Sequence, residues 1–96
     1  MSAYVIFDVK IHDQDRFKDF MTGVTPLVKA HGGTYLARGG DHKVYEGDWQ
    51  PSRIVLFEFP SVAAFETLYA SEEYAVLKAI RDECSTARLV SVTGLD

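Results

Sequence analysis

Two carboxylates stand out because they alternate with apolar residues in segments that predict strands. Asp8 lies in AYVIFDVKI, residues 3–11, and Glu58 lies in RIVLFEF, residues 53–59. Alternate residues of a strand point to the same side, so each carboxylate shares a face with apolar side chains. Desolvation raises the pKa of such a carboxylate unless a cation pairs with it, and groups of this kind occur at binding and catalytic sites. The alternative is a structural carboxylate held by a nearby Lys or Arg.

The strand pattern also predicts where the two carboxylates lie relative to each other. If the two segments are antiparallel neighbours, Asp8 lies near the start of the second strand and Glu58 near its end. The two groups then occupy opposite ends of the sheet. They are therefore not expected to act as an acid–base pair within one subunit.

Three further residues have the chemistry to contact a ligand. Arg38 precedes Gly39-Gly40 at a predicted strand end, and a guanidinium binds carboxylate or phosphate through two parallel hydrogen bonds. The glycine pair predicts a turn, because the Lys-Ser/Thr of a phosphate loop does not follow it. Tyr35 and Trp49 offer aromatic walls with a polar atom. The alternatives are a surface ion pair for Arg38, and core, edge or interface packing for the two aromatic residues.

No group of residues predicts a metal centre or a nucleophile. The three histidines, His12, His31 and His42, lie far apart in the sequence. His31 is a candidate general base, but it falls at a predicted helix end and no partner for it is identifiable. Cys84 lies on the apolar side of a predicted helix, where a thiol is buried and unreactive. No metal or organic cofactor is expected.

Length and charge narrow the classes of protein further. The 96 residues suit a single domain spanning 1–96, and 47% of them are hydrophobic. The net charge of -4 argues against nucleic acid or an anionic membrane as partner, because both attract basic surfaces. The sequence shows no basic segment followed by an apolar run, and no apolar stretch near the ~20 residues that span a bilayer. A cytoplasmic protein is expected.

The chemistry-bearing residues sit in a pattern of alternating strands and helices. Period-two and period-3.6 hydrophobicity predict strands over 3–11, 34–38, 44–46, 53–59 and 87–95, and helices over 13–31 and 61–84. Asp13 and Ser61 are the predicted N-caps, and Ser71 is a second cap that breaks the later helix. Pro26 is expected to kink or break the first helix.

This order predicts an α+β fold of βαββαβ type. The arrangement it favours is a four-stranded antiparallel sheet with the helices on one face, the ferredoxin-like fold. The opposite face then carries the apolar side chains Tyr4, Ile6, Ile54 and Leu56. Because such a face is too apolar for open water, two sheets are expected to pack face to face in a homodimer.

Four segments carry a family resemblance over residues 3–95. They are AYVIFDV, PLVKAHGGTYLARGG, VYEGDWQPSRIVLFEFPS and SEEYAVLKAIR. Together and in this order they resemble the family catalogued as Domain of Unknown Function 1330, within the dimeric α/β-barrel superfamily. The resemblance implies the ferredoxin-like fold and a homodimer whose sheets form a barrel. It implies no reaction, although the superfamily includes cofactor-free monooxygenases and heme-degrading enzymes.

Two functions fit these observations. The first is a dimeric small-molecule-binding protein, or an enzyme without cofactor that transfers a proton or oxygenates an activated substrate. Its pocket would lie between sheet and helices or in the dimer barrel, with Asp8, Arg38 and Glu58 as polar contacts and Tyr35 and Trp49 as apolar walls. The second is a non-catalytic dimeric module in which the polar groups only fix how the two sheets meet.

Overall fold

The computed structural model describes residues 1–96 and has the predicted order of elements. The four strands are β1 (Ala3–Ile11), β2 (Thr34–Arg38), β3 (Ile54–Phe59) and β4 (Ser85–Thr93). The three helices are α1 (Gln14–Ala30), α2 (Val62–Tyr69) and α3 (Glu72–Cys84). Since α2 and α3 follow each other across a short break, the chain is βαββαβ, and this prediction is confirmed.

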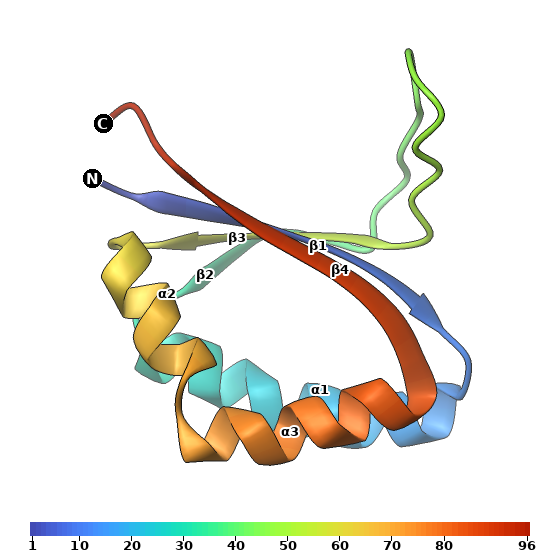
Figure 1. Ribbon diagram of the computed structural model, residues 1–96, viewed down its shortest axis with the longest axis horizontal. Coiled ribbons are helices and arrows are strands. Elements are labelled where there is room, and N and C mark those ends of the chain that lie inside the picture. The colour runs from blue at the N-terminus through green and yellow to red at the C-terminus, as the bar shows by residue number, and fades with distance from the viewer.

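The strands form one antiparallel sheet in the order β2-β3-β1-β4, and the helices lie together on one side of it (Figure 1). Tyr4 pairs with Glu58 and Asp8 with Ile54. The two carboxylates are therefore at opposite ends of the sheet, as the strand pattern predicted.

The core lies between the sheet and the helices. Val5 and Val9 of β1 are fully buried and Phe7 is 5% exposed, because the odd residues of this strand face the helices. The α1 stripe that meets them consists of Phe17, Phe20, Val24 and Val28. This layer gives the domain one continuous hydrophobic core that also contains Val55, Phe59, Leu68, Tyr74 and Cys84.

The three predicted helix caps are confirmed. The side chains of Asp13, Ser61 and Ser71 each accept a hydrogen bond from a backbone N–H three residues later, at 3.1 Å. These bonds satisfy donors that have no partner within the helix. Ser71 thus ends α2 and starts α3, which turns the chain and lets both helices cover the sheet.

Three predictions about element limits are wrong. Of the kink or break expected at Pro26, the break does not occur: helix α1 continues to Ala30, with Val24 and Val28 on either side of Pro26 buried in the core. Residues 44–46 form no strand, since β3 already has β2 and β1 as its two neighbours. Strand β4 covers 85–93 rather than 87–95, because it pairs with β1 along that strand's whole length.

Residues 40–52 form an irregular segment, here called the arm. Figure 1 shows the arm rising from the end of the sheet on the side away from the helices. Its Tyr45 is 83% exposed and Val44 is 41% exposed. The arm therefore projects apolar side chains beyond the domain that carries it.

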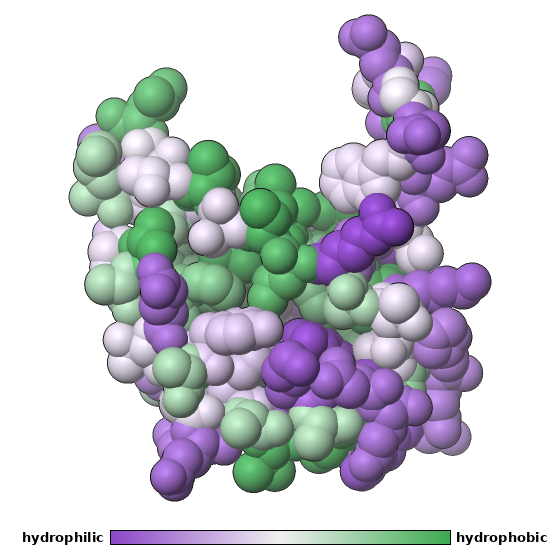
Figure 2. Space-filling view, in the orientation of Figure 1, coloured by the Kyte–Doolittle hydropathy of each residue, from purple (hydrophilic) through white to green (hydrophobic).

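The face of the sheet opposite the helices, here called the open face, is apolar along its middle. Val90 of β4 lies opposite Ile6 of β1, which lies opposite Leu56 of β3. Ile6 and Leu56 are half-buried, and Val90 is 59% exposed. Figure 2 shows this apolar floor as a hollow between two projections. None of the helices is long and apolar enough to cross a membrane.

Candidate functional site

The five candidate residues divide between the two faces of the sheet. Tyr35 and Arg38 line a pocket between the sheet and the helices. Asp8 and Trp49 lie on the open face, and Glu58 faces the same side as Tyr4, its partner across the strands. One protomer therefore does not bring all five residues to one pocket, and the roles of these residues in ligand binding stay predictions.

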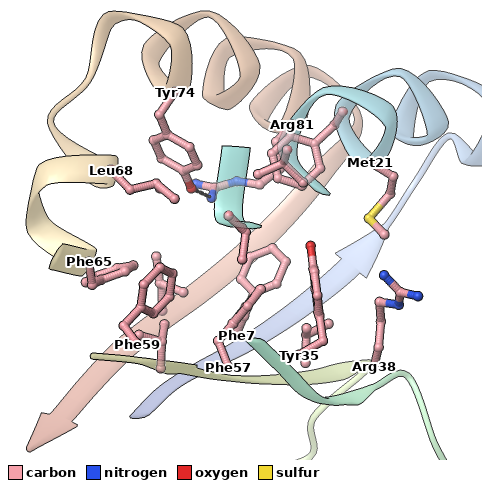
Figure 3. A pocket seen from close by; sticks show the side chains of 16 residues that line it. Phe7, Met21, Tyr35, Arg38, Phe57, Phe59, Phe65, Leu68, Tyr74 and Arg81 are labelled. Carbon is pink, nitrogen blue, oxygen red and sulfur yellow. Dashed lines mark hydrogen bonds between the residues drawn. The ribbon is translucent and has the colours of Figure 1, made fainter. Parts of the chain in front are cut away.

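The sheet–helix pocket is almost wholly apolar. It has a volume of about 40 Å³ and is lined by 16 residues, of which 14 are hydrophobic. This volume holds about three water molecules, or the end of a small organic molecule. Its labelled walls in Figure 3 are Phe7, Tyr35, Arg38, Phe57 and Phe59 from the sheet, and Met21, Phe65, Leu68, Tyr74 and Arg81 from the helices.

A β-bulge places Tyr35 and Arg38 on the same side of β2. Residues three apart in a regular strand point to opposite faces. Here the pairing shifts between Tyr35 and Ala37, so that Tyr35 lies opposite Phe57 and Arg38 opposite Val55. Both side chains consequently reach the pocket, which is the re-aiming that bulges produce.

The two side chains form one wall of the pocket. The Arg38 guanidinium carbon lies 4.6 Å from the centre of the Tyr35 ring, and that ring lies 4.7 Å from the Phe57 ring. Figure 3 shows the Tyr35 hydroxyl directed into the space between sheet and helices, with Arg38 beside Met21. Arg38 is exposed, so it marks the solvent side of the pocket.

Arg81 is a pocket residue that the sequence analysis missed. It is only 5% exposed, and its Nη1 donates a 2.6 Å hydrogen bond to the Tyr74 hydroxyl. Its guanidinium carbon lies 5.5 Å from the centre of the Phe7 ring. The signal was present, because residues 74, 77, 81 and 84 follow helical spacing and form the buried side of α3.

Asp8 anchors the base of the arm. Its Oδ2 accepts a hydrogen bond from Trp49 Nε1 at 3.0 Å, and its Oδ1 accepts one from the Ser52 backbone N–H at 2.9 Å. Burial alone would raise the pKa of Asp8, but these hydrogen bonds and the nearby charge of Arg88 outweigh it and leave the pKa below its ordinary value. Asp8 is thus an ionised residue with structural partners.

The lowered pKa of Asp8 predicts that acid weakens the attachment of the arm to the sheet. A carboxylate whose pKa is depressed by folding stabilises the native state above its unfolded pKa, and this contribution is lost as the pH falls through the folded pKa. In the wild type, the arm is therefore expected to loosen as the pH falls below about 4. Asp8→Asn is expected to loosen the arm already at neutral pH and to remove this acid transition. Trp49, the only tryptophan, reports both through its fluorescence.

Asp48→Asn is the matched control, because Asp48 is an exposed carboxylate of the same arm. It should leave the acid transition of Trp49 fluorescence unchanged. If Asp8→Asn also keeps the wild-type transition, protonation of Asp8 is not the cause of the change in Trp49 fluorescence.

Glu58 has a local partner at the other end of the sheet. The Tyr4 hydroxyl donates to Glu58 Oε2 at 3.4 Å, and the negative charge of Glu58 raises the pKa of Tyr4. Both groups border the open face. Glu58 therefore contributes to that face rather than to the sheet–helix pocket.

His31 and Cys84 have structural surroundings. His31 Nδ1 lies 3.0 Å from the Leu27 carbonyl oxygen at the end of α1. Cys84 is buried, as predicted, and burial raises the pKa of its thiol. No group of three or more His, Cys, Asp or Glu side chains is placed to hold a metal ion.

Solved structures with the same fold include proteins with and without a known activity. RPA0582 of Rhodopseudomonas palustris, a protein of unknown function, matches with a TM-score of 0.77 and 18% identity over 99% of this chain and 83% of that chain. A dimeric ferredoxin-like protein of unknown function from Jannaschia sp. CCS1 matches with a TM-score of 0.70 and 10% identity over 98% of this chain and 100% of that chain.

SnoaB of Streptomyces nogalater is similar to this chain and is a cofactor-independent oxygenase. It matches with a TM-score of 0.70 and 12% identity over 99% of this chain and 94% of that chain. At these identities the similarity establishes the fold alone. No curated protein sequence matches the chain.

The family assignment rests on nearly the whole chain. Residues 2–95 match the model of a domain of unknown function, DUF1330. The match includes both the sheet–helix pocket and the open face. The chain belongs to the DUF1330 family, in agreement with the resemblance of its four sequence segments.

Proposed function

We propose that the protein is a homodimeric small-molecule-binding protein that takes its ligand in the sheet–helix pocket. The observation that carries this proposal is the lining of that pocket, where Arg38 and Arg81 are the two polar exceptions among hydrophobic side chains. Ligand sites in proteins are typically apolar clefts with a few convergent polar groups. The tyrosine hydroxyls of the pocket add to this polar set.

The apolar open face supports the homodimer. Its central row consists of Val90, Ile6 and Leu56 and would face water in a monomer. Face-to-face packing of two sheets would bury this row in both protomers. A structural neighbour with the same fold is dimeric. In this arrangement the ligand pockets lie on the outer, helical sides of the two sheets.

The composition of the pocket favours binding over acid–base catalysis. No carboxylate, histidine or cysteine lines it. The remaining titratable groups other than arginine are phenols, and burial raises the pKa of the Tyr74 hydroxyl above its ordinary value. A general base works best when its pKa lies near the operating pH, so these residues are poor proton acceptors at neutral pH.

Cofactor-independent oxygenation is a second candidate function, favoured by the shared fold with SnoaB. Such a reaction would combine molecular oxygen with a substrate already ionised when it binds, so that the protein need not supply a base. The arginines of the pocket suit an ionised substrate. Oxygen uptake on addition of a ligand found by binding tests this candidate.

A non-catalytic dimeric module is the alternative to both candidates. Asp8 is occupied by the arm, and Glu58 is paired with Tyr4. These contacts favour a structural role for the open-face carboxylates, which would then set how the two sheets meet. A structural role for Asp8 and Glu58 involves only the open face, so it does not prevent a ligand from binding in the sheet–helix pocket.

A thermal-shift screen of the folded protein against small acids, aromatics and metabolites tests the proposed function. A ligand at a hundredfold excess over its Kd stabilises the native state by about 2.7 kcal/mol. In a domain of this size the Tm should rise by several degrees. The shift should shrink in Arg38→Ala, which alters the pocket, and persist in the control Glu58→Gln, which alters the open face.

Two results would contradict the proposal. One is a set of ligands whose shifts disappear in Glu58→Gln and survive in Arg38→Ala, which would move the site to the open face. The other is a screen without hits on a protein shown to be a folded dimer, which would favour the structural module.

A further inference from the structure

We infer that Arg81 is an anion-binding residue and that the ligand of the sheet–helix pocket is a small carboxylate with an apolar body. This inference rests on the proposed function, because it names the ligand class for the same pocket. It starts from the hydrogen-bonding state of the Arg81 side chain.

The Arg81 guanidinium is buried with its Nε donor unused. Its side chain is 7% exposed, and its Nε is buried without any hydrogen-bond partner. Its Nη1 donates a hydrogen bond to the Tyr74 hydroxyl, and its Nη2 forms a 3.5 Å salt bridge with Asp82 Oδ1. Because guanidinium has five N–H donors and is always charged, burial in this state is unfavourable unless an anion joins it.

The nearest carboxylate does not fill this role. Asp82 Oδ1 lies 3.5 Å from Arg81 Nη2, whereas Asp82 Oδ2 lies 2.8 Å from Lys78 Nζ. The Asp82 side chain is 53% exposed, and its hydrogen bond with Lys78 is the main cause of its lowered pKa. Asp82 therefore bridges Lys78 and Nη2 of Arg81 at the surface and leaves Nε without a partner, and the pocket itself contains no carboxylate.

Aromatic packing explains part of the Arg81 environment and leaves the donors unsatisfied. The guanidinium carbon lies 5.5 Å from the Phe7 ring centre and 6.0 Å from those of Phe20 and Tyr74. These cation–π contacts stabilise the charge. A ring face accepts no directed bond comparable to that of a carboxylate oxygen, so an oxyanion remains the missing partner of the N–H groups.

Tyr74 adds a second donor at the same place. Its oxygen accepts the hydrogen bond from Arg81, so its own proton is free to be donated to a ligand. Figure 3 shows the Arg81 and Tyr74 side chains meeting at the helical side of the pocket, above the aromatic residues of the sheet. An oxyanion placed there would receive bonds from both groups.

The size and polarity of the pocket select a carboxylate. The volume of about 40 Å³ admits a carboxylate with a short aliphatic chain. Hydrophobic walls solvate such a chain and do not solvate the remaining oxygens of a phosphate. Any larger body would extend toward Arg38 at the solvent side.

Butyrate and its neutral analogue butyramide separate charge from shape. Both probes are titrated into the wild-type dimer at constant ionic strength. Butyrate should bind at least about tenfold more tightly than butyramide, because a hydrogen bond to a charged group contributes more than one between neutral groups. Calorimetry measures both affinities. The Arg81 Nε–H resonance in NMR should shift with butyrate and stay in place with butyramide.

Substitutions test whether Arg81 and Tyr74 cause the preference for butyrate over butyramide. Arg81→Met should abolish the preference for butyrate, and Tyr74→Phe should weaken it while keeping the buried ring. Arg16→Met is the matched control, because Arg16 pairs with Asp19 and Glu83 on the surface. If Arg81→Met fails to fold, the wild-type comparison and Tyr74→Phe still decide the question.

The outcomes separate this inference from the proposed function. Equal affinities for butyrate and butyramide would overturn the anion site and leave a neutral-ligand pocket. Tighter binding of inorganic phosphate than of butyrate would overturn the carboxylate class. Absence of binding by both probes, together with a thermal-shift screen without hits, would overturn the inference and the proposed function together.

Discussion

Val90→Asp is expected to convert the dimer to monomers, raising its dissociation constant by at least about a hundredfold. Val90 is 59% exposed in the protomer and begins the apolar row that continues through Ile6 and Leu56. In a twofold interface each substitution occurs twice, so two additional carboxylates would be desolvated in the apolar row. Sedimentation equilibrium over a range of protein concentrations measures the change.

Val76→Asp is the matched control for this substitution. Val76 is 66% exposed and lies on α3, in the helical layer on the other side of the sheet. The variant should dimerise like the wild type. A Val90→Asp protein that stays as dimeric as the control would show that the open face is not the interface.

Phe59→Ala is expected to lower the free energy of unfolding by about 3–5 kcal/mol, the usual loss for a buried phenylalanine. Phe59 is 2% exposed, its ring centre lies 5.4 Å from that of Phe65, and it forms part of the pocket wall. The loss combines the transfer of the ring from water with the cavity it leaves. Urea unfolding at one fixed protein concentration measures it, because dimerisation makes the stability depend on concentration.

Val76→Ala serves as the control for apolar truncation at an exposed site. It should change the free energy of unfolding by no more than about 0.5 kcal/mol. A loss below about 1 kcal/mol in Phe59→Ala would mean that the aromatic wall of the pocket is loosely packed. The pocket would then be larger in solution than about 40 Å³.

The parts of the fold that depend on local chemistry were predictable. The alternation of Val5, Phe7 and Val9 set the buried face of β1, and the side chains of Ser61 and Ser71 set where helices begin. The placement of Asp8 and Glu58 at opposite ends followed from antiparallel pairing alone. Each of these features depends on residues within one or two elements.

The parts of the site that depend on several elements were not predictable. The bulge after Tyr35 arises from the pairing of β2 with β3, and it alone brings Arg38 to the pocket side. Residues 44–46 of the arm do not pair with β3, because β3 already has β2 and β1 as its two neighbours. Since strand patterns do not contain these pairings, the sequence alone did not show that the five candidate residues divide between the two faces of the sheet.

Arg81 was missed for a different reason. Charged residues are seldom fully buried, so an arginine among apolar helix positions is ordinarily assigned to the surface. Here its position matches the buried stripe of α3, and Tyr74, seven residues earlier on the same stripe, supplies its hydrogen-bond partner. A charged residue in phase with a helix stripe is therefore a useful sequence signal for a buried polar site.

The most direct test of the central claim is to locate the ligand by NMR of the valine and leucine methyl groups. With a ligand from the screen, we predict that the methyl resonances of Val24, Val28 and Leu68 shift, because these residues line the sheet–helix pocket. Those of Val90 and Val92, on the last strand, should stay in place. Shifts confined to Val90 and Val92 would contradict the account, since the ligand would then bind outside the pocket between sheet and helices.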